Sequence, residues 1–171
     1  MSPAMNKSAP YAALVGFSFL WCLLLVAPPF IGLVEGRGTV LSSLIYQFFS
    51  PICHQLDSHS LHLFGTKFAV CARCFGIYAG FLAGAVSVLF RAGNISRRTL
   101  IIWAVAGAPM LIDVLLDIGG IHESTLLTRL FTGLFFGILA GRILTPLFGE
   151  GISDVLNRSS IFQGTIDEPK T

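Results

Sequence analysis

Three of the four cysteines in this chain lie beside polar side chains that can take part in chemistry. Cys53 is followed directly by His54, and Cys71 and Cys74 form a Cys-x-x-Cys pair that encloses Arg73. Thiolates and imidazoles are common ligands of zinc, and two nearby thiols can also form a disulfide. These residues therefore indicate a metal site, a redox pair or a structural disulfide, and their spacing leaves all three open.

For a metal site, Cys53, Cys71, Cys74 and His54 would supply four ligands to Zn or Fe, with His59 or His62 as alternative sources of the imidazole. With three protein ligands and a bound water, the same site could activate that water. Other polar residues of the apolar segments could then orient a ligand, move a proton or stabilise charge. These catalytic candidates are Asp113, Arg129, Arg73 and Tyr78.

Two alternatives use the same sulfur atoms. Arg73 would stabilise a neighbouring thiolate, which favours thiol–disulfide exchange in the membrane with Cys53 as the exchange partner. Enzymes of that kind generally use two cysteine pairs, whereas the remaining cysteine, Cys22, stands alone in an apolar segment. In the third interpretation, a disulfide from Cys53 to Cys71 or Cys74 fastens a loop in a structural membrane subunit.

Composition shows what must position these residues. The chain has 171 residues, of which 54% are hydrophobic and only 12% are charged, whereas soluble domains carry about 25% charged residues. Four apolar runs, at 11–33, 68–90, 100–119 and 126–148, approach or exceed the roughly 20 residues that cross a bilayer. We therefore expect an all-α membrane protein, a bundle of four transmembrane helices. Its net charge of +2 is too small and too dispersed to indicate nucleic-acid binding.

Basic residues predict the orientation of the bundle. Arg91, Arg97 and Arg98 lie together between the second and third runs, and positive loops favour the cytoplasm. This places residues 1–10 and a mobile tail at 149–171 in the cytoplasm, on either side of a membrane domain at 11–148. The loop at 34–67 then faces outward from the cytoplasmic (inner) membrane. Its apolar segment 40–50 is expected to form a short helix at the outer interface.

Small residues predict how the helices pack. Glycines recur at every fourth position in the second and fourth runs, at Gly76, Gly80 and Gly84 and at Gly133, Gly137 and Gly141. Such stripes let two helix backbones approach closely in lipid. We expect them to join the second and fourth helices of one chain. A homodimer or another membrane-protein partner is the alternative, besides the lipid bilayer itself.

The predicted topology brings the polar residues of the helices to one level. Asp113 and Asp117 share a face of the third helix near its outer end, and Arg129 lies near the outer end of the fourth. We expect Asp113 to pair with Arg129, and the charged residues to form a single outward-facing site with the cysteines, His54 and Tyr78.

The motifs in 50–80, Cys-His-Gln at 53–55 and Cys-Ala-Arg-Cys-Phe-Gly-Ile-Tyr at 71–78, resemble an uncharacterised prokaryotic membrane-protein family, a domain of unknown function. Segments 109–113 and 123–133 resemble its second block. The resemblance implies four helices but no known reaction. One position departs from the family pattern, since His59 stands where an arginine is usual before the loop serine. The implied motif positions are Cys53, His54, Ser60, Cys71, Arg73, Cys74, Tyr78, Asp113, Ser124 and Arg129.

Overall fold

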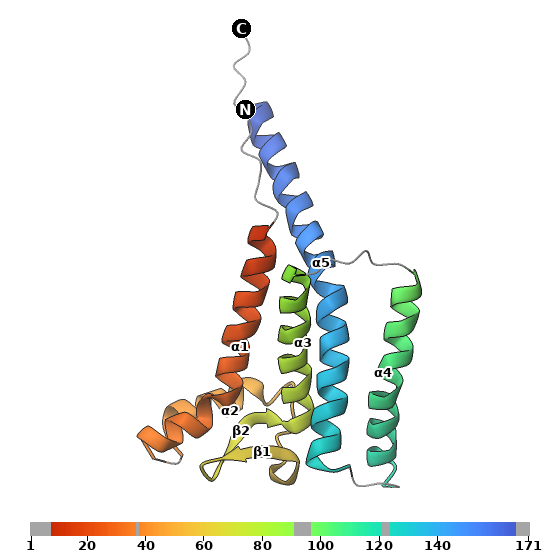
Figure 1. Cartoon of the computed structure of the whole chain (residues 1–171). Helices are drawn as coiled ribbons and strands as arrows, with labels where there is room; N and C mark the ends of the chain where they lie inside the picture. Colours follow the sequence, from red (N-terminus) through yellow and green to blue (C-terminus); the bar gives the residue numbers. More distant parts are fainter. Residues whose placement is uncertain (1–7, 37, 91–96, 121–123, 167–171) are drawn as a thin grey trace.

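The computed structural model describes residues 8–36, 38–90, 97–120 and 124–166. Its elements are α1 (Ser8–Val34), α2 (Val40–Phe49), a 3-10 turn (Asp57–His59), β1 (Ser60–Leu63), β2 (Thr66–Cys71), α3 (Ala72–Phe90), α4 (Arg97–Ile118) and α5 (Leu126–Ile166). Helices α1, α3, α4 and α5 run along one another, while α2 and the two strands lie across one end of them (Figure 1). Helix α1 begins and α5 ends at the opposite end.

Within the described residues, three helices are long and apolar enough to cross a membrane. These spans are Ala9–Val34, Ala72–Phe90 and Leu126–Gly149, which belong to α1, α3 and α5. Large apolar side chains on their outer surfaces are exposed, as expected for contact with lipid; Leu20 is 66% exposed and Phe90 85%. Helix α4, with 22 residues, lies beside α5 as a further long helix (Figure 1).

Helices α3 and α5 approach so closely that side chains are excluded from part of their contact. A Cβ atom added at Gly80 would overlap the carbonyl oxygen of Leu134, and one at Gly137 would overlap the carbonyl oxygen of Ile77. The remaining glycines of the two series meet the partner helix in the same way. Both series thus face each other within one chain.

The second apolar run, 68–90, was expected to be entirely helical, but its first residues belong to a β-hairpin. Strands β1 and β2 are antiparallel, with Leu63 opposite Thr66 and Ser60 opposite Cys71. The two turn residues, Phe64 and Gly65, have φ angles of 54° and 72°, as a two-residue hairpin turn requires. Residues 68–71 therefore belong to β2, and the helix begins only at Ala72, because the turn pairs this segment with β1.

Helices α1, α2 and α5 form where helices were predicted, and α5 continues beyond its predicted end. The predicted short helix at 40–50 is confirmed as α2, whose first turn is capped by the Thr39 hydroxyl accepting from the Ser42 N–H. Pro28 and Pro29 lie inside α1, which continues to Val34. Helix α5 passes the end of its apolar run at residue 148 and continues to Ile166.

Candidate functional site

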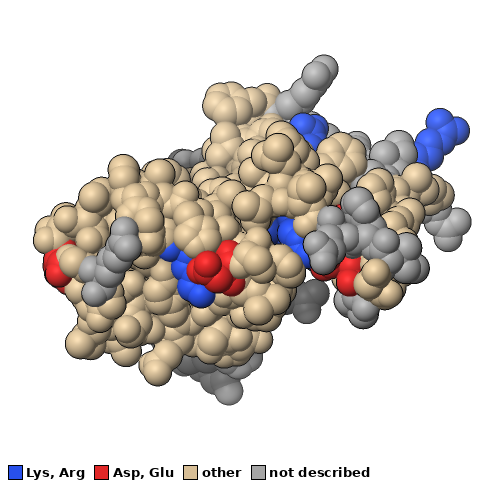
Figure 2. All heavy atoms as spheres, turned by 90° about the horizontal axis from the view of Figure 1, so that it is seen from below, with Lys and Arg blue, Asp and Glu red and all other residues tan. Residues whose placement is uncertain are grey.

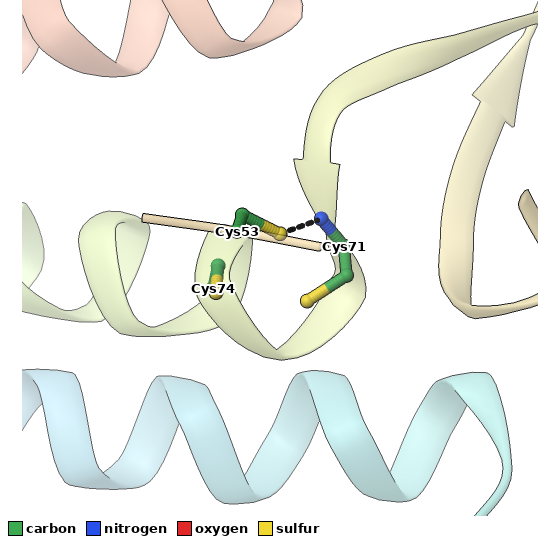
Figure 3. Close-up of side chains that lie close together, drawn as sticks. All are labelled: Cys53, Cys71 and Cys74. Carbon is green, nitrogen blue, oxygen red and sulfur yellow. Dashed lines mark hydrogen bonds between the residues drawn. The ribbon is translucent and has the colours of Figure 1, made fainter. Parts of the chain in front are cut away.

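Three cysteines from different parts of the chain meet at the end of α3. Cys53 comes from the loop after α2, Cys71 ends β2, and Cys74 lies in the first turn of α3 (Figure 3). Their Sγ atoms all lie within 4.8 Å of one another. Cys53 and Cys71 are buried and Cys74 is half-buried, and all four cysteines of the chain are free thiols. The sulfur cluster predicted from the spacing is thus formed by the fold.

Local hydrogen bonds favour negative charge on this sulfur cluster. The Cys71 N–H donates to Cys53 Sγ at 3.2 Å (Figure 3), and the positive end of the α3 dipole lies beside the same sulfur atoms. The Cys71 and Cys74 thiols also donate toward Cys53, which lowers the pKa of the Cys53 thiol. The bond to Cys53 raises the pKa of Cys71. Cys53 is therefore the sulfur most ready to act as a thiolate.

Apolar side chains surround the sulfur cluster. Cys53 and Cys71 belong to a buried core that also contains Leu25, Phe49 and Val70. Tyr78 packs against this core from the next turn of α3. These apolar neighbours offer no further ligand atoms, so an ion bound here would be held mainly by the sulfur atoms.

A polar network that the sequence reasoning missed holds the Cys53 loop in place. The Gln55 side-chain amide donates to the carbonyl oxygens of Tyr46, 2.8 Å away, and Ala69, 2.9 Å away. Lys67 Nζ donates to the Gln55 carbonyl at 2.9 Å, and the Tyr46 hydroxyl donates to the Lys67 carbonyl at 2.6 Å. Gln55 itself has φ 49°, an uncommon angle for this residue. In the sequence, the position of Gln55 in the Cys-His-Gln motif was the signal that could have indicated this role.

The structure differs from the sequence prediction at His54. Among the described residues, the group that could hold a metal contains the three cysteines and does not include this imidazole. His54 is exposed, and its ring lies edge-on to His59 with centroids 5.9 Å apart. Cys53 is buried whereas His54 is exposed, so this irregular segment directs the two neighbouring side chains to different sides.

The charged candidates form a second cluster between α3, α4 and α5. Arg73 binds Asp113, and Arg129 Nη2 lies 2.6 Å from Asp117 Oδ1. The predicted Asp113–Arg129 pair is therefore wrong. Arg129 Nε donates to the Ser124 carbonyl at 3.2 Å, which turns its guanidinium toward Asp117 and leaves Asp113 to Arg73.

Ser124 and His59 complete this charge cluster. The Ser124 hydroxyl lies 3.4 Å from Arg73 Nη2 and 3.3 Å from Asp117 Oδ1, so it connects the two ion pairs. His59 Nε2 lies 3.3 Å from Arg129 Nη2. Burial and the adjacent Arg129 guanidinium lower the pKa of His59. At neutral pH this imidazole is thus held uncharged.

The fold therefore divides the predicted single site into two clusters. Tyr78 goes with the cysteines, whereas Arg73, Asp113 and Arg129 belong to the charge cluster. Viewed from the hairpin end, acidic and basic atoms gather in a few small groups on an otherwise uncharged face (Figure 2). Arg73 lies between Cys71 and Cys74 in the chain, so the first turn of α3 contributes to both clusters.

Apolar spanning helices with buried sulfur and charge clusters near one end define a multi-pass membrane protein. The chain belongs to the family described as Predicted membrane protein (DUF2085), whose profile matches residues 53–143. An uncharacterized protein of Methanocaldococcus jannaschii is 33% identical over 145 residues, which cover 81% of this chain and 92% of the relative. One of Methanothermobacter thermautotrophicus is 30% identical over 90 residues, 53% of this chain and 81% of the relative. No solved structure matches the chain.

Proposed function

We propose that this protein binds a transition-metal ion such as Zn or Fe at Cys53, Cys71 and Cys74. The proximity of the three Sγ atoms, all within 4.8 Å, supports this most directly. A Zn–S bond is about 2.3 Å, so sulfur atoms that share one ion lie about 3.8 Å apart. Small side-chain rotations would close the present arrangement around an ion. A water or a small ligand would take the fourth position, since His54 points elsewhere.

We further propose that four helices cross the cytoplasmic membrane, with α4 as the fourth, and that the sulfur cluster lies on the outer side. The start of α1 and the end of α5 lie at one end of the bundle, opposite the hairpin (Figure 1). Arg97 and Arg98 open α4, which runs from that same end toward the hairpin end. The positive-inside tendency then places both termini in the cytoplasm.

In this proposal the charge cluster holds the site in place. Arg73 and Arg129 are bound to aspartates of α4, so these pairs fix α3 and α5 to α4 close to the sulfur atoms. Tyr78 packs against the cysteine core and limits access to it from the membrane. The three charged candidates and Tyr78 would thus act by positioning and shielding the metal.

Metal analysis of the protein purified in detergent tests the proposal. We expect about one Zn or Fe per chain, and we expect Cys53→Ser, Cys71→Ser and Cys74→Ser each to lose it. Cys22→Ser is the matched control, because this cysteine lies on α1 outside the cluster and its variant should keep the metal.

The same samples separate the alternatives. Metal-free protein in which cysteine pairs cycle between thiol and disulfide would replace the metal site by a thiol–disulfide oxidoreductase. Metal-free protein with one static disulfide, lost in the Cys53→Ser variant, would replace it by a structural fastening of the loop. Either result would overturn metal binding.

A further inference from the structure

An apolar pocket of about 330 Å³ lies between α1 and α3. Four aromatic rings line it: Phe17 and Trp21 from α1, and Tyr78 and Phe81 from α3. The hydroxyl of Ser18, which also lines the pocket, already donates to the Leu14 carbonyl at 2.8 Å. The pocket therefore suits a ligand that is largely apolar and has a flat ring to stack on aromatic walls.

The pocket and the core around the sulfur cluster share two side chains. Trp21 and Tyr78 line the pocket and also pack against the buried core that contains Cys53 and Cys71. Tyr78 follows Cys74 by one helical turn, so both project from neighbouring positions of α3. A molecule in the pocket would lie on the membrane side of the two rings, with the sulfur atoms behind them.

The surrounding membrane can supply the ligand. Both helices that form the pocket belong to candidate membrane spans, and Phe17 is 60% exposed. Trp21 lies 12 residues after Ala9, where the first span begins, or about 18 Å along a helix. On α3, Tyr78 lies six residues after Ala72, where that span begins, or about 9 Å along the helix. The pocket therefore lies within the hydrocarbon layer of about 30 Å, in the half nearer the hairpin end.

We propose that the pocket binds the ring of a lipid-soluble quinone. A quinone combines a flat ring with an apolar tail, which matches the aromatic lining and the access from lipid. Two thiols of the adjacent sulfur cluster, when it holds no metal, can give two electrons and two protons to a quinone, which forms one disulfide and one hydroquinone. A plain acyl chain accepts no electrons, so the sulfur cluster suits a quinone better. The inference goes beyond metal binding and concerns a separate cavity.

Tryptophan fluorescence tests the proposal, because quinones quench indole emission on contact. The chain has two tryptophans, so Trp103→Phe leaves Trp21 as the reporter in the pocket wall. The purified full-length variant is titrated with a decyl-substituted benzoquinone. We expect quenching that saturates with one site per chain. Quenching that rises in proportion to quinone without saturating would show mere partition into the detergent, and would overturn the proposal.

Two filled-pocket variants and one matched control make the test specific. Ser18→Phe and Leu14→Phe place a ring in the cavity and should weaken binding at least tenfold. Leu20→Phe adds a ring on the same helix at a lipid-facing position outside the lining and should leave binding unchanged. Equal binding in all three variants would place the quinone elsewhere on the protein.

Two further arms address the competing occupant and the metal proposal. Decylbenzene, which has the tail and a ring but no quinone oxygens, should not displace the quinone. Equal displacement would make the pocket a general lipid site and would overturn the choice of ligand. The titration is repeated with Cys53→Ser protein, where saturable quenching should persist. Loss of metal without loss of quenching then distinguishes the two proposals.

Discussion

Neutralising the charges of the two ion pairs, singly and in combination, tests how the helices are held together. The structure pairs Arg129 with Asp117 and Arg73 with Asp113. The depths in the membrane that the sequence predicts for these residues would instead pair Arg129 with Asp113. Double-mutant cycles distinguish these arrangements, because only residues in direct contact share a large interaction energy. The relevant variants are Asp117→Asn, Asp113→Asn and Arg129→Gln, alone and in combination.

The burial of each side chain sets the expected magnitudes. The Arg129 side chain is 2% exposed and that of Asp117 is 21% exposed. Removing Asp117 leaves a buried guanidinium without its counter-charge, which costs about 3–5 kcal/mol. Removing Arg129 leaves a partly hydrated carboxylate, so we expect a loss near the lower end of that range. The double variant removes both charges and should recover about 2–3 kcal/mol of the summed losses.

Reversible unfolding in mixed micelles, followed by circular dichroism, measures these free energies. Asp113→Asn with Arg129→Gln should show a coupling below about 1 kcal/mol, because these residues are connected only through Arg73 and Ser124. Asp57→Asn, at an exposed pair with His62, is the charge-matched control and should cost less than about 1 kcal/mol. Strong coupling of Arg129 to Asp113, with additive losses at Asp117, would refute the observed pairing.

Three further outcomes are expected, one from helix packing, one from the Cys53 loop and one from the titration of His59. Gly80→Ala should destabilise the protein by about 1–3 kcal/mol through overpacking against α5, whereas Gly16→Ala, with open space around it, should be neutral or stabilising in the same unfolding assay. Gln55→Ala removes two hydrogen bonds from the Cys53 loop and should cost about 1–3 kcal/mol; faster thiol labelling of Cys53 would report the loosened loop, and an unchanged rate would contradict this role. Because the pKa of His59 is lowered in the folded state, the unfolded chain binds more protons between that pKa and the ordinary value of about 6.5, so stability should fall as the pH drops through this window. His59→Gln should flatten that slope, and an unchanged pH profile would contradict the assignment.

Tertiary contacts decided which polar residues meet. Asp113 and Asp117 lie four residues apart on one face of α4, so a shift of about 6 Å along the helix axis decides which of them meets Arg129. The hydrogen bond from Arg129 to the Ser124 carbonyl holds the guanidinium beside Asp117. Ser124 lies just before the start of α5, and Arg129 lies within that helix. The separation of His54 from the cysteines has a similar origin, since it depends on the local path of an irregular segment.

The hairpin was missed for a related reason. Residues 68–71 are apolar and continue directly into an apolar helix, so their hydrophobicity alone does not distinguish strand from helix. Pairing with β1 decides the outcome, and the positive φ angles of Phe64 and Gly65 set its register. A glycine at the second turn position was the only local signal for this pairing.

The sequence by itself determined the membrane class, the approximate positions of the long helices and the closeness of Cys71 to Cys74, three residues further on. Those properties depend on hydrophobic length and on near neighbours in the chain, which each segment carries on its own. Only the tertiary structure decided the ion-pair partners, the approach of Cys53 to Cys71 and Cys74, and the position of His54 outside that group. These features depend on the rotation and contact of elements far apart in sequence, and no local pattern specifies them.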